Sequence, residues 1–272
     1  YGNSVNQKHD FSIQGGTEKA SYYFSGGYLT QKGVLNYGDD VFRRTNLLGK
    51  VSIAITDFWD FSWETRFSQK YRERSSHWNG ADYTNAFKYI TRWVYPFSPL
   101  YDGWGNISRA SMLPFILSGT EKTKNLDYWN NFRMEVRPLK GWKINADFAY
   151  NTQSHNVSNL HRQAYEYSVS SNTPVALAQT KPNNLAKQKY DNYYWNTNIY
   201  TSYTFDILEA HHFHMMAGMQ LEKGNNDLIH GYKTDLIVED IPSFQTATGP
   251  ITLSEALGHS AIQGYFGRIN YN

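Results

Sequence analysis

The chain has 272 residues and a formal net charge of +2; 17% of its residues are aromatic and only 18% are charged. This length holds one large all-β unit or two small domains, and so small a charge, without a run of Lys and Arg, gives no support for a nucleic-acid partner. The absence of Cys excludes a disulfide scaffold and a thiolate metal site.

Alternating strand patterns open the chain. Strands are predicted for residues 8–14, 20–31 and 42–56, with a Gly-containing tight turn at 15–19 and a short loop at 33–40. Residues 57–58 then form a very short turn into the next strand. The start of the chain therefore indicates an antiparallel sheet built from hairpins.

The stretch Trp59 to Arg72 has the strongest period-2 pattern. One side carries mostly aromatic residues, whereas the other is wholly polar and includes five charged residues: Asp60, Glu64, Arg66, Lys70 and Arg72. The stretch is long enough to cross an outer membrane, which takes roughly nine to eleven residues. A Lys or Arg facing lipid near the midplane costs about 2 to 4 kcal/mol, so we expect the charged side to face a wet lumen, with Trp59 and Tyr71 near the two membrane edges.

A long strand of a water-soluble sandwich would explain the same alternation. It explains less well why the apolar side consists of Trp and Phe rather than Val, Ile and Leu, and why the pattern recurs at similar length. No segment approaches the roughly 18 consecutive apolar residues of a membrane helix.

A long excursion at residues 75–124 follows and is predicted to be functional or to carry its own structure. Helical spacing within it predicts a short amphipathic helix with Asp82 as its cap, formed by Tyr83, Ala86, Phe87, Ile90 and Val94. Residues 96–106 are predicted to be irregular loop, and Asp102 to Asn106 an ordinary turn rather than a calcium loop.

Strand patterns resume at residues 126–137, 142–150, 193–205, 213–221 and 261–272, joined by short turns at 138–141 and 206–210 and by long loops at 152–188 and 223–260. Alternation of long and short connections is typical of outer-membrane barrels. The fold class predicted is all-β: an antiparallel transmembrane β-barrel segment, part of a large barrel, with long extracellular loops. Nine strands, no initiator Met at Tyr1 and an apparent cut strand at residues 264–272 predict an internal piece of a longer protein.

Particular motifs resemble one transporter family. The segment HDFSIQGGTEKASYYFSGGYLTQKG (residues 9–33), followed by Phe42-Arg43-Arg44-Thr45-Asn46, and the later GYFGRINY (residues 264–271) resemble barrel strands of SusC/RagA-type TonB-dependent outer-membrane transporters. The resemblance implies that residues 1–272 are a partial barrel domain, without the plug and the remaining strands, of a barrel with roughly 22 strands. It further implies active import of oligosaccharides or peptides across the outer membrane, with the TonB complex acting through the plug region and a SusD-like surface lipoprotein as partner.

Aromatic residues in the long loops are the candidate ligand-binding residues: Trp78, Tyr83, Trp93, Tyr95, Tyr101 and Trp104. Flat rings stack on apolar sugar faces or on peptide side chains. Any single one of them could instead pack its loop or contact the lipoprotein. The five charged residues that we expect to face the lumen, Asp60, Glu64, Arg66, Lys70 and Arg72, could guide a polar solute. They could instead pair with the plug and with neighbouring strands.

Other chemistries have weaker support. His211, His212 and His214 suggest a metal site, since His212 and His214 lie on the same side of a strand. No third ligand of suitable spacing accompanies that pair, so we expect no metal site and no cofactor. No nucleophile motif supports an enzyme. A passive porin or surface adhesin on the same barrel, without TonB coupling, is the alternative function; a barrel-embedded hydrolase is a third.

Overall fold

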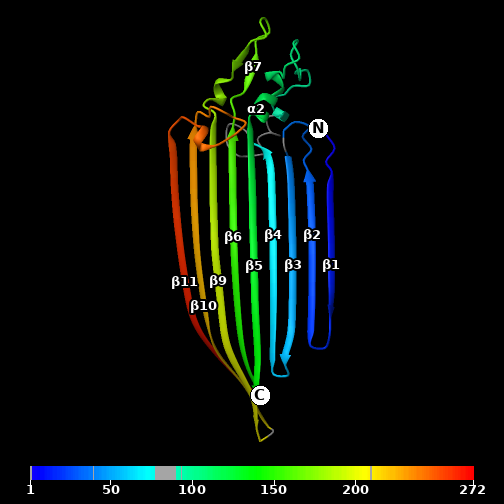
Figure 1. Cartoon of the computed structure of the whole chain (residues 1–272), viewed down its shortest axis with the longest axis vertical. Coiled ribbons are helices and arrows are strands. Elements are labelled where there is room, and N and C mark those ends of the chain that lie inside the picture. Colours follow the sequence, from blue (N-terminus) through cyan, green and yellow to red (C-terminus); the bar gives the residue numbers. More distant parts are fainter. Residues whose placement is uncertain (1, 39, 77–89, 93, 209) are drawn as a thin grey trace.

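A computed structural model describes residues 2–38, 40–76, 90–92, 94–208 and 210–272. Nine strands form one antiparallel sheet in the order β1-β2-β3-β4-β5-β6-β9-β10-β11, and each neighbour in space is also the next long strand in the chain (Figure 1). The strands are β1 Asn6–Gly16, β2 Ala20–Lys32, β3 Asp40–Thr56, β4 Trp59–Ser75, β5 Gly119–Leu139, β6 Trp142–His161, β9 Asn184–Ile207, β10 His211–Thr234 and β11 Ile251–Tyr271.

The two sides of the sheet differ as the alternation predicts. Cross-strand pairing places Trp63, Phe132 and Phe148 in one row, and their rings stack at centroid separations of 6.5 and 6.2 Å. We call this side the apolar face. The adjacent row on the other side, the polar face, contains Glu64 and Asn131.

None of the residues that the structure describes forms a second layer over the apolar face. Phe11 on β1 is 66% exposed, and Trp63 and Phe67 are only half-buried. The buried apolar residues of the described chain instead lie at the loop end of the sheet or in the loops: Leu113, Phe115, Ile116, Leu160, Ala164, Leu177, Leu185, Leu236 and Ala247. This distribution excludes the core of a water-soluble sandwich for the described part of the chain, because aromatic rings are left on an open surface.

The short and long connections lie at opposite ends of the sheet. Residues 17–19, 57–58, 140–141 and 208–210 separate strands at one end, whereas 33–39, 76–118, 162–183 and 235–250 connect them at the other (Figure 1). In the turn at 140–141, Gly141 has φ of +81°, and a Cβ there would lie 2.3 Å from the Thr204 carbonyl oxygen, so only glycine fits. The predicted alternation of connections is therefore confirmed.

Several strand limits predicted from sequence were wrong. Residues 152–161, 184–188, 223–234 and 251–260 belong to strands rather than loops, β5 begins at Gly119, and residues 261–271 belong to a strand that begins at Ile251. The extensions carry polar side chains on both faces, so hydropathic alternation fades there. Continuous backbone pairing, such as His161 with Asn184, extends the strands regardless of side-chain type.

The loops carry small elements of their own. They are the 3₁₀ turns η1 Arg109–Ser111, η2 Ala178–Thr180 and η3 Phe244–Thr246, the helix α2 Leu113–Leu117, and a hairpin of β7 Tyr165–Tyr167 and β8 Pro174–Ala176. Residues 90–92 are helical, while the rest of the helix predicted around Tyr83 falls largely outside the described residues. Within the described chain, no helix has the length and apolar character to span a membrane.

Candidate ligand-binding surface

The long loops form a structured cap at one end of the sheet. Leu113 and Ile116 of α2 pack with Tyr37 from the β2–β3 loop, and Phe115 of the same helix packs with Ala164 and Leu177 from the β6–β9 connection. One five-residue helix thus joins two loops, because its apolar side chains point to different neighbours. Leu160, Leu185, Leu236 and Ala247 form another small cluster beneath the β10–β11 loop.

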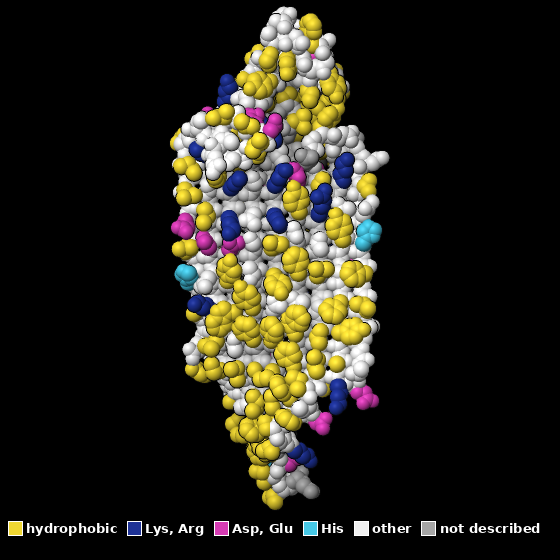
Figure 2. Space-filling view, in the orientation of Figure 1, with side chains coloured by type: hydrophobic (Ala, Val, Ile, Leu, Met, Phe, Trp, Pro, Cys, Tyr) yellow, Lys and Arg dark blue, Asp and Glu magenta, His cyan; other side chains and the backbone are white. Residues whose placement is uncertain are grey.

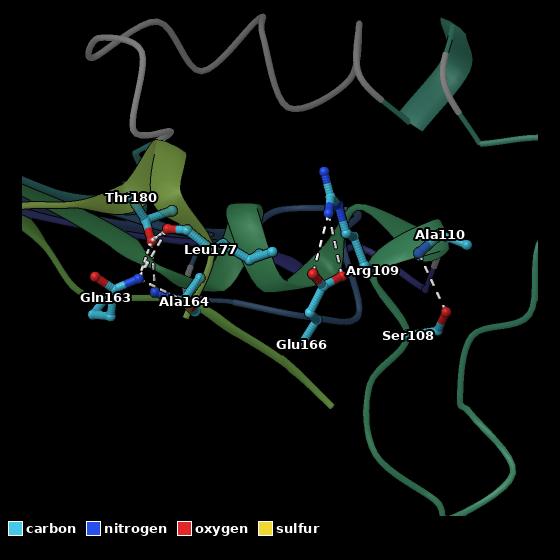
Figure 3. Close-up of polar contacts among 8 residues, drawn as sticks. All are labelled: Ser108, Arg109, Ala110, Gln163, Ala164, Glu166, Leu177 and Thr180. Atoms are coloured by element: carbon cyan, nitrogen blue, oxygen red, sulfur yellow. Dashed lines mark hydrogen bonds and ion pairs between the residues drawn. The ribbon is translucent and has the colours of Figure 1, made fainter. Parts of the chain in front are cut away.

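Polar contacts fix the base of the β7–β8 hairpin (Figure 3). The Gln163 side-chain amide donates to the carbonyls of Ala164 and Leu177 at 2.9 and 3.0 Å and to the Thr180 hydroxyl at 2.6 Å. Arg109 Nη1 lies 3.2 Å from a carboxylate oxygen of Glu166 in β7. These bonds hold the hairpin against the 94–118 loop, so the cap presents a defined surface.

Tyr95 and Phe97 form an exposed aromatic pair. Their rings stack with centroids 5.5 Å apart and an interplanar angle of 5°, and Phe97 is 84% exposed. Phe97 was not among the residues predicted from sequence. Its place two residues after Tyr95, in a Pro-flanked segment, is the signal that identifies it, since prolines restrict the backbone on both sides.

Trp104 is held by its indole nitrogen, yet most of its ring remains accessible. Nε1 donates to the Val169 carbonyl at 2.8 Å, and Trp104 as a whole is 58% exposed. The neighbouring Asn106 amide donates to Asn172 at 2.7 Å. Trp104 therefore both supports the tip of the hairpin and offers a ring face of fixed orientation.

A tight turn orients Trp104. Asp102 Oδ1 accepts hydrogen bonds from the backbone N–H groups of Trp104 and Asn106, both at 2.9 Å, and Gly105 adopts φ of +87°. Desolvation alone would raise the pKa of Asp102, but hydrogen bonds from the Asn106 side chain and from backbone N–H groups outweigh it and hold the pKa below its usual value. The segment is a turn stabilised by an ionised carboxylate.

The three described candidates are anchored separately. Tyr101 shares a hydroxyl–hydroxyl contact of 3.2 Å with Tyr37, Tyr95 stacks on Phe97, and Trp104 binds the hairpin. They lie in one loop. Trp78, Tyr83 and Trp93 fall outside the described residues.

The polar face contains a hollow of about 620 Å³ below the cap. Its lining includes Asp10, Tyr23, Arg66, Asp127 and Trp129. Trp129 projects from the polar side of β5, where its ring meets Tyr194 edge-on at 6.3 Å. Rings together with charged groups on one concave wall suit a solute that has both polar groups and flat apolar faces.

Trp129 was missed as a candidate because the apolar pattern of β5 is dominated by Tyr128 and Phe132. Its position in the same alternating set as Asp127 and Asn131 is the sequence signal that places it on the polar face.

Charged residues on the polar side of β4 pair within the sheet. Asp60 contacts Arg137 of β5 at 2.6 Å, and Glu64 contacts Arg66 on its own strand at 3.0 Å. Farther up the polar face, Arg74 and Glu121 pair at 2.8 Å with little exposure. Asp60, Glu64 and Arg66 therefore form ion pairs within the sheet itself.

Two of the three histidines near the turn end have polar partners. His211 Nδ1 lies 2.7 Å from the Tyr271 hydroxyl, and His212 Nδ1 lies 2.6 Å from Asp206. Among the described residues, no group of three or more His, Asp or Glu side chains is arranged to hold a metal ion.

Comparisons with known proteins agree with this architecture. No protein-family model matches the chain. TonB-dependent receptor P26 of Formosa agariphila is 23% identical over an alignment that covers 96% of this chain and 26% of the receptor. Among solved structures, the RagAB peptide importer superposes with a TM-score of 0.72 in its open-open state, at 14% identity over 97% of this chain and 29% of that chain. In the closed-closed state the TM-score is 0.68, at 16% identity over 97% of this chain and 30% of that chain.

These comparisons confirm the resemblance to SusC/RagA-type TonB-dependent transporters and the fold class. The chain spans about a quarter of the length of the curated relative and about three tenths of that of the RagAB chain. At this identity the structural likeness is one of fold. The relatives are a receptor and an importer by name, not enzymes, in agreement with a non-enzymatic role.

Proposed function

We propose that this chain is part of the barrel wall and surface loops of an outer-membrane importer of the SusC/RagA type. One observation carries the proposal: nine long strands combine an uncovered aromatic face with a polar, hollowed face, and their long loops gather at a single end. Lipid is the environment that makes the first face stable, and an aqueous passage is the one that makes the second stable.

The cargo class that fits the surface is an oligosaccharide or a peptide. Trp104 and the Tyr95–Phe97 pair offer accessible ring faces in the cap, and Trp129 and Arg66 lie on the polar face below it. A solute captured by stacking in the cap would next meet the polar wall. We propose that Tyr101 also contacts the ligand, together with Trp78, Tyr83 and Trp93, which lie outside the described residues.

The proposed partners follow from the same assignment. A SusD-like surface lipoprotein would cover the loop end, and the TonB complex would energise uptake through the plug region. RagAB is named as a peptide importer, which supports peptides as one cargo class. A passive porin or a surface adhesin would use the same wall without TonB.

The test is uptake by cells that carry the full-length gene. Deletion of the gene is expected to abolish growth on at least one member of a panel of oligosaccharides and peptides, and deletion of tonB to have the same effect. Uptake that persists without TonB would instead identify a porin. Loss of surface attachment with no nutrient phenotype would identify an adhesin.

Variants locate the contacts of the cargo that the panel identifies. Trp104→Ala is expected to weaken its capture several-fold, because stacking of a ring contributes about 0.5 to 1.5 kcal/mol. Trp104→Phe should preserve part of that effect. Phe58, which is exposed at the turn end of the sheet, provides the matched control, and Phe58→Ala should leave capture unchanged.

A further inference from the structure

Basic side chains gather near the loop end of the apolar face. Figure 2 shows Lys and Arg side chains collected above the hydrophobic side chains of the sheet and beneath the loops. Cross-strand pairing places seven basic residues in three successive rows of the apolar face, and we call this set the basic belt: Lys32, Arg43, Lys122, Lys124, Lys187, Lys189 and Lys233.

The belt retains an excess of positive charge. Four carboxylates share its rows or the row directly below: Glu73, Asp191, Asp227 and Glu255. Lys122 contacts Glu73 at 2.9 Å and Lys189 contacts Asp191 at 2.7 Å, yet these lysine side chains are 54% and 62% exposed. An ammonium group has three donors, so a single carboxylate partner leaves donors for another anion.

Aromatic rings support two other members of the belt. Arg43 lies over the ring of Tyr71 at 5.9 Å, and Lys187 lies over that of Phe244 at 5.6 Å. These contacts hold the cations close to the surface of the sheet while their outer sides remain accessible. Arg43 and Lys187 therefore have defined positions on the sheet.

The height of the belt matches a membrane headgroup layer. On β9, the apolar face carries Tyr203 near the turn end and Tyr193 toward the loop end. Ten steps of about 3.3 Å separate them, which is roughly 25 Å along the membrane normal at a tilt of 35–45°. That distance equals the apolar band of an outer-membrane barrel. Lys189 lies four residues, about 13 Å of strand, beyond Tyr193.

One cation departs from this arrangement. Lys223 also projects from the apolar face, but it lies in the row of Tyr150 and Trp195, within the band. Its long apolar stem allows the ammonium group to reach toward the headgroups. It is not counted in the belt.

We propose that the basic belt binds the phosphate groups of anionic lipid headgroups in the outer leaflet. This inference rests on the outer-membrane location proposed above. Ammonium groups bind phosphate as point charges and guanidinium binds it through paired donors, so seven cations in three rows complement a lipid that carries more than one phosphate. The bound lipid would hold the loop end of the wall at a fixed depth.

The test uses the full-length protein extracted from the outer membrane in mild detergent. Native mass spectrometry counts the lipopolysaccharide bound per protein, before and after delipidation and re-addition. Three probes are added separately: lipopolysaccharide, enzymatically dephosphorylated lipopolysaccharide, and inorganic phosphate. The first is expected to bind and the other two to bind at least about tenfold more weakly, because each basic residue near an anionic headgroup contributes about 1 kcal/mol, close to fivefold in affinity.

Two variants act on the belt, and a third is the control. Lys122, Lys124, Lys187 and Lys189 are replaced together by Gln in the first variant and by Arg in the second. The control replaces by Gln four lysines of the polar face, Lys8, Lys50, Lys70 and Lys143. In each set two lysines have a carboxylate partner, so the loss of ion pairs is matched.

The Gln variant of the belt is expected to lose at least about tenfold in bound lipopolysaccharide, while the Arg variant and the control retain it. Equal loss in the belt and control variants, or equal binding of the dephosphorylated lipid, would overturn the proposal. If the Gln variant does not fold, the binding of intact and of dephosphorylated lipopolysaccharide is compared on the parent protein and on the Arg variant. Equal binding of the two lipids would again overturn the proposal. Cargo uptake is measured in the same strains, so a transporter that imports normally but binds no lipid contradicts this inference alone.

Discussion

A charge placed on the apolar face should be far more harmful than the same charge placed one residue away. Phe148 on β6 projects from the apolar face and Ala149 from the polar face. The row of Phe148 includes Thr197, which lies between Tyr193 and Tyr203 on β9, so Phe148 sits near the middle of the apolar band.

The expected cost follows from two contributions. A lysine facing lipid near the midplane costs about 2–4 kcal/mol. Loss of the ring stacked at 6.2 Å on Phe132 costs about 0.5–1.5 kcal/mol more. We therefore expect Phe148→Lys to lower the free energy of unfolding by about 2.5–5.5 kcal/mol, and Ala149→Lys, whose side chain reaches water, by less than about 1 kcal/mol.

The measurement is urea-induced unfolding of the full-length protein in lipid vesicles, followed by tryptophan fluorescence. Phe148→Ala separates the loss of packing from the added charge. If Phe148→Lys and Ala149→Lys differ by less than about 1 kcal/mol, the apolar face does not contact lipid and the assignment of the two faces is wrong.

Three further predictions concern the cap. Gln163→Ala removes three hydrogen bonds and should increase protease cleavage of the β7–β8 hairpin severalfold, whereas Thr180→Ser, which keeps a hydroxyl, should leave cleavage near the parent rate. Trp104→Phe removes the bond to Val169 and should raise hydrogen exchange at the hairpin tip; unchanged exchange would show that this bond does not hold the tip. The lowered pKa of Asp102 means that its stabilisation of the turn is present above the pKa of the unfolded chain and is lost as the pH falls through the lower folded value, so Trp104 fluorescence should change only in acid. Asp102→Asn should abolish that transition, and its persistence would assign it to another group.

Much of the sheet could be predicted because its determinants are local. The alternation from Trp59 to Arg72 marks two faces, and Gly141 marks a turn that no other residue fits. A sheet with one apolar and one polar face requires that alternation, so the sequence alone reveals it. The same reasoning predicted that the long connections lie at one end.

The cap could be predicted only in part. The sequence identified Tyr95, Tyr101 and Trp104 as aromatic residues of the long loops. The hydrogen bond from Trp104 to Val169 and the stacking of Tyr95 on Phe97 depend on how the loops pack and could not be predicted. The β7–β8 hairpin was missed because its strands are only three residues long and gain stability from contacts such as Arg109–Glu166.

The sequence by itself determined which side chains lie on the apolar face and which on the polar face, because strand periodicity assigns a side to each residue before any neighbour is known. The tertiary structure decided how far each strand continues beyond the apolar band and which residues share a row. Lys122 and Lys187, 65 positions apart in the chain, lie in one cross-strand row through Ser158. Register is set by pairing across the whole sheet, and a single strand carries no information about it.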